Sequence, residues 1–303
     1  MPAVVHSSGN ELGECAQFAD GFTWGTVRRA DVKLAGEVAA GISIQTVGDQ
    51  PGGATSIPVD CSNTGADKST VAKLGANGIL GVGMFVNDCD ACTTSVIPAT
   101  YYSCSTTGCT GARITAGQAV THPVAHFLQD NNGVLLILPA VTDLGATNPT
   151  GSLIFGIGTQ ANNALGNATL YVVDNRGNFT TTYQGQTISR SFSDSGSNAI
   201  FFADAAITQC SPSTGFYCPA TPLALSASIK AVGGGASTTV NFSIVSVDAL
   251  SNGVTAANAG GPSGKIFGAS TFDWGLPFFF GRKVFTAISG TSTPGGPGPF
   301  LAF

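Results

Sequence analysis

Charged residues are scarce in this sequence. Lys and Arg together number 12, and Asp and Glu together number 17, so only 10% of the 303 residues carry charge. An ordinary soluble domain has roughly 25%. The net charge is −5, and the basic residues form no cluster. Because neutralising phosphates requires clustered Lys and Arg, nucleic acid is excluded as an expected partner.

Long apolar runs are also lacking. The longest, residues 133–141, is far shorter than the roughly 20 residues that a membrane-spanning helix needs. We therefore expect no membrane span. Hydrophobic residues still make up 43% of the chain, enough for a sizeable core, and this composition does not predict disorder.

The prevailing pattern is an alternation of apolar and polar residues. It covers residues 223–231 and 240–244, on either side of three consecutive glycines. A period of two predicts half-buried strands. The best helical pattern covers residues 120–129. It carries His122 and His126, for which a solvated helix face is favoured over a metal site. The sequence thus predicts an all-β protein with one or two short helices.

The chain contains eight cysteines: Cys15, Cys61, Cys89, Cys92, Cys104, Cys109, Cys210 and Cys218. Their even number and the Ser-, Thr- and Gly-rich loops between them favour disulfides, and therefore an oxidising compartment. We expect pairs Cys104–Cys109 and Cys210–Cys218, followed by Cys89–Cys92 and Cys15–Cys61. A zinc site made of the four central cysteines is the alternative. We expect no metal and no cofactor.

The first residues, MPAVVHS, lack the basic head and apolar run of a signal peptide. A disulfide-bonded chain is nevertheless expected to be exported, to the periplasm, the cell surface or the medium. This combination predicts that the true N-terminus lies upstream of residue 1.

A turn that can carry chemistry lies at Asp194, Ser195 and Gly196, between two segments rich in apolar residues. A carboxylate on a tight turn accepts hydrogen bonds from backbone and hydroxyl donors, which stabilises its charged form. Two such carboxylates that face each other share one proton, so that one acts as base on water and the other as acid. The alternative interpretation is a plain β-turn, because the tripeptide D-S-G is common.

Around this turn the sequence resembles the pepsin-like aspartic peptidases, whose two lobes each carry D-[ST]-G followed later by two apolar residues and Gly. The D-S-G at residues 194–196 and the IFG at 266–268 are similar to the second-lobe pattern. Residues 272–285 are similar to the closing apolar stretch and final strand. The resemblance implies a two-lobed pepsin-like β-barrel architecture, with Asp194 as half of a catalytic dyad and Ser195 and Gly196 shaping its turn.

Residues 18–25, FADGFTWG, are similar to the flap of the family. The resemblance makes Phe18, Asp20, Gly21 and Trp24 flap or cleft residues. Phe18 then replaces the flap tyrosine. The implied partner is a peptide or protein held in the cleft between the lobes.

The other first-lobe pieces match in part. Residues 77–83, NGILGVG, are similar to the family's D-G-I-L-G-L, with Asn77 in place of Asp. Residues 151–156 are similar to the strand that ends the first lobe. Residues 1–17 contain no D-[ST]-G, which should precede the flap. The first lobe is therefore expected to be incomplete.

The segments GILGVG, IFGIGTQANNALG and DSGSNA are also typical of a family of exported bacterial proteins that is known as a domain of unknown function. The resemblance implies an upstream D-T-G-S and hence an N-terminally truncated member. We expect an incomplete first lobe at 1–156, a second lobe at 157–290 and a Gly- and Pro-rich tail at 291–303.

The predicted function is that of an exported aspartic-peptidase-like protein. It would be a hydrolase only if a second catalytic Asp were supplied, and we expect no turnover from these 303 residues. Two alternatives stay open: a non-catalytic exported module that binds a peptide or glycan, and a structural protein of the cell surface.

Overall fold

The protein is described from a computed structural model, which covers residues 1–210, 215–265 and 268–303. Backbone contacts divide the chain into two compact units, Met1–Gln129 and Asp130–Phe303. The predominantly β class is confirmed. The described residues contain three α-helices rather than one or two, each of four residues: α1 Val59–Ser62, α2 Val71–Leu74 and α3 Leu276–Phe279. The expected lobe boundary at residue 156 stays a prediction.

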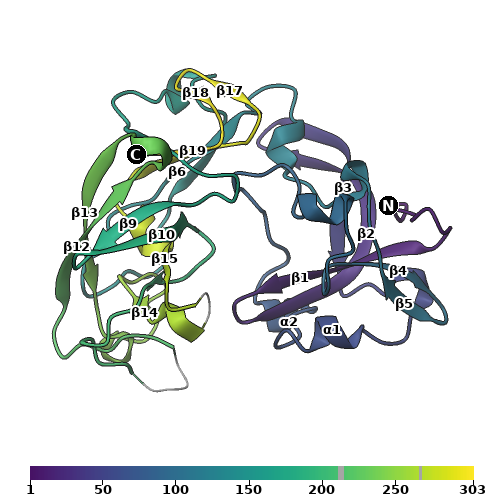
Figure 1. The fold of residues 1–303 in the computed structure, drawn as a ribbon, viewed down its shortest axis with the longest axis horizontal. Helices are drawn as coiled ribbons and strands as arrows, with labels where there is room; N and C mark the ends of the chain where they lie inside the picture. The colour runs from purple at the N-terminus through teal and green to yellow at the C-terminus, as the bar shows by residue number, and fades with distance from the viewer. Residues whose placement is uncertain (211–214, 266–267) are drawn as a thin grey trace. The chain divides into compact units, whose positions relative to one another are not determined.

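Unit 1 is built on one antiparallel sheet of order β3-β2-β1-β4-β5 (Figure 1). Its strands are β1 Glu11–Phe18, β2 Gly21–Leu34, β3 Glu37–Val47, β4 Tyr101–Ser105 and β5 Gly108–Gly111. Its 3-10 helices are η1 Pro51–Gly53, η2 Asp90–Thr93, η3 Ala116–Gln118 and η4 Pro123–His126. Apolar residues also alternate at 32–34 in β2 and at 42–44 in β3, with the period of two that half-buried strands show.

The sheet of unit 1 is covered on both faces. One apolar cluster contains Leu12, Val27 and Tyr101. The other contains Trp24 and Tyr102, whose rings meet edge to face with centroids 5.4 Å apart. Successive residues of a strand point to opposite faces, so neighbouring residues of β4 serve different clusters. The inner strands of this sheet are therefore buried on both sides.

Unit 2 contains a seven-stranded sheet of order β13-β12-β9-β10-β15-β11-β14 (Figure 1). Its strands are β9 Phe179–Tyr183, β10 Gln186–Ser193, β11 Ile200–Phe201, β12 Leu223–Lys230, β13 Ser237–Ile244, β14 Gly260–Gly261 and β15 Thr271–Trp274. The predicted strands at 223–231 and 240–244 are confirmed as the antiparallel pair β12 and β13. One pairing in the middle of the sheet is parallel, that of β10 with β15.

A five-stranded sheet of order β7-β6-β16-β19-β8 and a two-stranded ribbon complete unit 2. Their strands are β6 Gly133–Ile137, β7 Ser152–Phe155, β8 Leu170–Val172, β16 Lys283–Ala287, β17 Ser292–Thr293, β18 Gly296–Pro297 and β19 Phe300–Ala302. The remaining 3-10 helices are η5 Ala161–Asn163, η6 Val232–Gly234, η7 Val247–Ala249 and η8 Ser263–Lys265.

The prediction of a tail at 291–303 is wrong. β19 lies inside the five-stranded sheet, between β16 and β8. Phe300, Leu301 and Ala302 are at most 1% exposed. The Gly and Pro residues form the β17–β18 ribbon, and the three apolar residues after them return to the core.

An aromatic cluster fills one face of the seven-stranded sheet. Phe272 stacks on Phe202 with ring centroids 5.2 Å apart, and Trp274 lies 4.6 Å from Phe272. The Trp274 Nε1 donates a hydrogen bond to Thr181 Oγ1 on β9 at 2.9 Å. Because Phe272 and Trp274 are alternate residues of β15, they share this face and Asp273 between them points to the other.

The predicted helix at 120–129 is wrong. Only the 3-10 turn η4 forms, with Pro123 as its first residue, and it ends at His126, after which the backbone of Phe127 is extended. Val124 and Phe127 are both buried, and so is His122, for which the expected solvated face is wrong; His126 is exposed. Because a 3-10 turn places residues three apart on one side, as an α-helix roughly does, the apolar spacing suits either structure.

All four predicted disulfides are confirmed: Cys15–Cys61, Cys89–Cys92, Cys104–Cys109 and Cys210–Cys218. The zinc alternative is wrong because its four cysteines are disulfide-bonded. Four disulfides suggest an oxidising compartment. Within the described ranges, no helix is long and apolar enough to cross a membrane.

The Cys15–Cys61 disulfide is expected to contribute most to stability in unit 1. It joins residues 46 apart, whereas Cys89–Cys92 joins residues 3 apart. The loss of loop-closure entropy in the unfolded chain predicts a cost of about 4 kcal/mol for removing the first and below about 2 kcal/mol for the second. We expect Cys15→Ala/Cys61→Ala to lower the urea midpoint much more than Cys89→Ala/Cys92→Ala. Both pairs contain a fully buried cysteine, so equal losses would contradict the entropic account.

Candidate functional site

Asp194 follows the last residue of β10, where the chain turns away from the sheet. Its backbone N–H donates to the carbonyl oxygen of Trp274 on β15 at 3.1 Å. This bond continues the parallel pairing in which Phe192 faces Asp273 and Ser193 faces Trp274. The end of β15 therefore fixes where the turn begins.

The carboxylate of Asp194 is held by its own turn. Oδ1 accepts a hydrogen bond from the backbone N–H of Gly196 at 2.8 Å, and Oδ2 accepts one from the hydroxyl of Ser197 at 3.0 Å. The Ser197 N–H donates to the Asp194 carbonyl oxygen at 3.2 Å, which closes a β-turn. Asp194 and Ser195 are half-buried, and Gly196 is exposed. The D-S-G turn thus presents a carboxylate with two donors, as its sequence indicated.

The segment that faces this turn is β15. Residues 266 and 267 of the apolar-apolar-Gly motif at 266–268 lie outside the described residues. β15 ends at Trp274, and at the next residue, Gly275, a Cβ would lie 1.9 Å from the carbonyl oxygen of Ala199. The N–H of Leu276 donates to the Ser197 carbonyl oxygen at 2.7 Å. Only a glycine lets β15 and the chain after Asp194 approach so closely.

The structure brings a second acid, Asp273, to this turn. Asp273 is 0% exposed, and neither carboxyl oxygen has a hydrogen-bond partner. Burial, together with the Asp194 charge, raises the pKa of Asp273 to about 8, and the nearby Ser197 hydroxyl offsets this only in part. Sequence reasoning missed Asp273, although an acid between Phe272 and Trp274 in an apolar run is a signal of burial.

The candidate flap residues lie in the β1–β2 hairpin, where Phe18 pairs with Gly21. Phe18 is 40% exposed. The Asp20 carboxylate accepts from Lys68 Nζ at 2.9 Å. A Cβ on Gly21 would lie 2.2 Å from the Ala66 carbonyl oxygen. The tip of the hairpin is therefore anchored on residues 66–68, and its role as a flap stays a prediction.

Trp24 differs from the other candidate flap residues. It is 0% exposed and packs against Tyr102 in the core of unit 1. Its side chain therefore belongs to the core of unit 1 and not to the exposed tip of the hairpin. Ile79 and Leu80, in the segment that resembles D-G-I-L-G-L, are 58% and 40% exposed and belong to no strand.

Unit 1 also holds a pair of acids that sequence reasoning missed. Glu14 on β1 is 3% exposed, and its Oε2 has no hydrogen-bond donor. Its carboxyl lies within hydrogen-bonding reach of Asp88, and the hydroxyl of Tyr101 lies 2.7 Å from both Asp88 oxygens. Burial first, and then the Asp88 charge, raises the pKa of Glu14 well above its usual range. The pair can share one proton.

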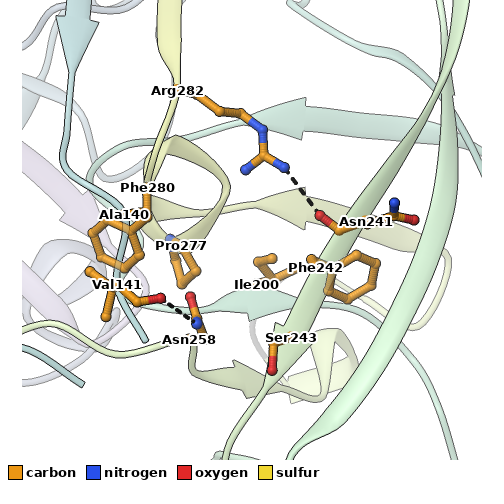
Figure 2. Close-up of a pocket in the computed structure, with 10 residues that line it drawn as sticks. All are labelled: Ala140, Val141, Ile200, Asn241, Phe242, Ser243, Asn258, Pro277, Phe280 and Arg282. Carbon is orange, nitrogen blue, oxygen red and sulfur yellow. Dashed lines mark hydrogen bonds between the residues drawn. The ribbon is translucent and has the colours of Figure 1, made fainter. Parts of the chain in front are cut away.

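A small pocket in unit 2 is lined by residues from β13, β11 and the α3 region (Figure 2). Its volume is about 180 Å³, below the roughly 300–1,000 Å³ of ligand sites. Figure 2 shows the Arg282 guanidinium pointing to the Asn241 carbonyl oxygen, to which Nη2 donates at 3.1 Å. Burial lowers the pKa of Arg282. None of the predicted site residues lines this pocket.

A larger cavity, about 490 Å³, lies along β10 and residues 203–206. The Tyr183 hydroxyl donates to Asp204 Oδ2 at 2.7 Å, and Gln184 Nε2 donates to the same oxygen at 3.0 Å. The volume falls in the range of ligand sites. The cavity thus combines adequate room with convergent polar groups.

The described residues define a disulfide-bonded, predominantly β protein whose Asp-Ser-Gly turn lies beside a buried aspartate. The chain belongs to the family described as Protein of unknown function (DUF3443), whose model matches residues 1–303. The expected membership of a family known as a domain of unknown function is therefore confirmed. No curated protein matches the chain. The likeness to pepsin-like peptidases stays a prediction.

The Glu14–Asp88 pair predicts that unit 1 loses stability as pH rises. Between the ordinary glutamate pKa, about 4.3, and the raised folded-state pKa of Glu14, the folded chain binds more protons than the unfolded chain. The contribution of this pair to stability is therefore complete below about pH 4.3 and falls above it. We expect Glu14→Gln to flatten this fall in urea unfolding midpoints measured from pH 4 to 8. Asp88→Asn should flatten it in part, and an unchanged slope in Glu14→Gln would contradict the shared proton.

Proposed function

We propose that the protein is an exported aspartic-peptidase-like protein in which Asp194 is one of the two acids. The observation that carries this proposal is the geometry of the turn. A half-buried carboxylate at the end of a strand accepts one backbone and one hydroxyl hydrogen bond, at 2.8 and 3.0 Å. Donors of this kind hold a carboxylate ionised and oriented, which a general base requires. The four disulfides support export.

Hydrolysis by this mechanism needs two carboxyls with different roles. The ionised one accepts a proton from the attacking water, while the protonated one donates to the peptide carbonyl oxygen. The 303 residues contain one D-[ST]-G, at 194–196. The nearest second acid, Asp273, is 0% exposed and so cannot touch a peptide. Under this proposal, the chain therefore supplies the general base, Asp194, but no accessible second acid that faces it.

We expect the 303-residue chain to cleave no peptide at acidic pH. The measurement is a casein or peptide-library digestion at pH 3 to 6, with Asp194→Asn as the matched control. Cleavage by the wild type that the variant loses would show that a second accessible acid exists, contrary to our expectation. A chain extended upstream to include a further D-[ST]-G is expected to cleave, and to lose that cleavage on Asp194→Asn. An inactive extended chain would refute the peptidase function.

A non-catalytic binding module is the second candidate. It is supported by the 490 Å³ cavity beside β10, where Tyr183 and Gln184 converge on Asp204. Phe18 at the hairpin tip, 40% exposed, offers an apolar contact where the resemblance would place a hydroxyl. Neither feature requires Asp194 to react.

Filling the cavity separates the two candidates. Ser189 on β10 lines the cavity and is exposed, so Ser189→Trp should occupy it without disturbing the core. If the chain is a binding module, ligands found by peptide and glycan arrays should be lost by Ser189→Trp and retained by Asp194→Asn. The reverse pattern would place binding at the Asp194 turn instead.

A further inference from the structure

The carboxyl of Asp273 lies in apolar surroundings on the face of β15 opposite the aromatic cluster. Residues directly across a ladder share a face, and Asp273 is paired with Phe192 on β10 and Phe201 on β11. Phe201 in turn belongs to a cluster with Ala199 and Ala259. The carboxyl is therefore flanked by phenylalanine positions on both neighbouring strands.

An ionised carboxylate cannot easily persist there. Both Asp273 oxygens lack a hydrogen-bond partner, and the residue is 0% exposed. Transferring a charge into such a site costs several kcal/mol unless it is paired, so the group takes up a proton instead. On the paired strands β10 and β11 and in the turn between them, the charged groups are Arg190, which is exposed, and Asp194. Of these, only Asp194 shifts the pKa of Asp273, and it raises it.

The Ser197 hydroxyl connects the two acids. It donates to Asp194 Oδ2 at 3.0 Å, and it lies close enough to Asp273 to lower the pKa of that carboxyl, although it makes no hydrogen bond to it in this structure. A protonated Asp273 can donate to Ser197 Oγ, while Ser197 keeps donating to Asp194. Each bond in such a chain polarises the next, which strengthens donation to the final acceptor.

We propose that Asp273 is a positioning residue for Asp194: it stays protonated at neutral pH and, through the Ser197 hydroxyl, keeps the single negative charge of the pair on Asp194. The chemical use of that charge rests on the proposed function. The protonation itself does not, because it follows from burial and strand register. No covalent bond is made or broken: the Asp273 carboxyl and the Ser197 hydroxyl each keep their own proton, and the Asp194 carboxylate accepts.

The pair is tested by carbon NMR of the 303-residue chain with labelled aspartate carboxyls. We expect one carboxyl to remain protonated at pH 7, to titrate near the raised pKa of about 8, and to be missing from Asp273→Asn. In Asp194→Asn the same resonance should titrate at lower pH, because the neighbouring charge is gone. If every aspartate carboxyl is already ionised at pH 6, the proposal is overturned.

The positioning role is tested on Asp194 itself. Asp273→Asn keeps the shape and a donor, whereas Asp273→Leu keeps only the volume. We expect the Asp194 carboxyl to titrate at higher pH in Asp273→Leu than in Asp273→Asn, since only asparagine can donate to Ser197. Equal titration in the two variants would overturn the relay. If Asp273→Leu does not fold, Asp273→Ala replaces it, because alanine also lacks a donor and leaves the bond from Ser197 to Asp194 in place.

These outcomes are distinguishable from those of the peptidase assay. An inactive extended chain with a protonated Asp273 would refute the peptidase function and leave the pair intact. An active extended chain in which Asp273 is ionised at pH 6 would support the peptidase function and refute the protonated pair.

Discussion

The parallel pairing of β10 with β15 positions every group around Asp194. It aligns Phe192 with Asp273 and leads directly into the bond from the Asp194 N–H to the Trp274 carbonyl oxygen. The two strand ends can converge because Gly275 has no Cβ to meet the Ala199 carbonyl oxygen. Two aspartates that are far apart in sequence thereby become neighbours, one on a half-buried turn and one in the core.

Burial of a single carboxyl beside a second acid occurs in both units. Glu14 and Asp273 each lie within a sheet, at 3% and 0% exposure, and each has its pKa raised by burial first and by a neighbouring carboxylate next. The folded state therefore retains protons that the unfolded chain releases. The contribution of each of these two carboxyls to stability is consequently larger in acid than at neutral pH. Such a dependence suits the acidic conditions in which a carboxylate pair of the proposed kind would work.

Local sequence patterns were sufficient to predict the strands and disulfides that depend on residues close together in the chain. The alternation at 223–231 and 240–244 predicts β12 and β13, and short Cys-to-Cys loops predict two of the four disulfides. Asp273 could not be placed in this way, because its position depends on pairing with Phe192, which lies far away in the chain. The same limit explains β19: its three apolar residues follow a Gly- and Pro-rich stretch typical of a tail, and only pairing with β16 and β8 makes them core. Val124 and Phe127 show a third limit, since their spacing suits a 3-10 turn as well as an α-helix.

Neutron diffraction from deuterium-exchanged crystals of the 303-residue chain at pH 7 would test the central claim most directly, because it locates the proton itself. The account predicts a deuteron on the Asp273 carboxyl directed at Ser197 Oγ, with the Ser197 deuteron directed at Asp194. A bare Asp273 carboxylate, compensated by a bound cation or by ordered water, would contradict it.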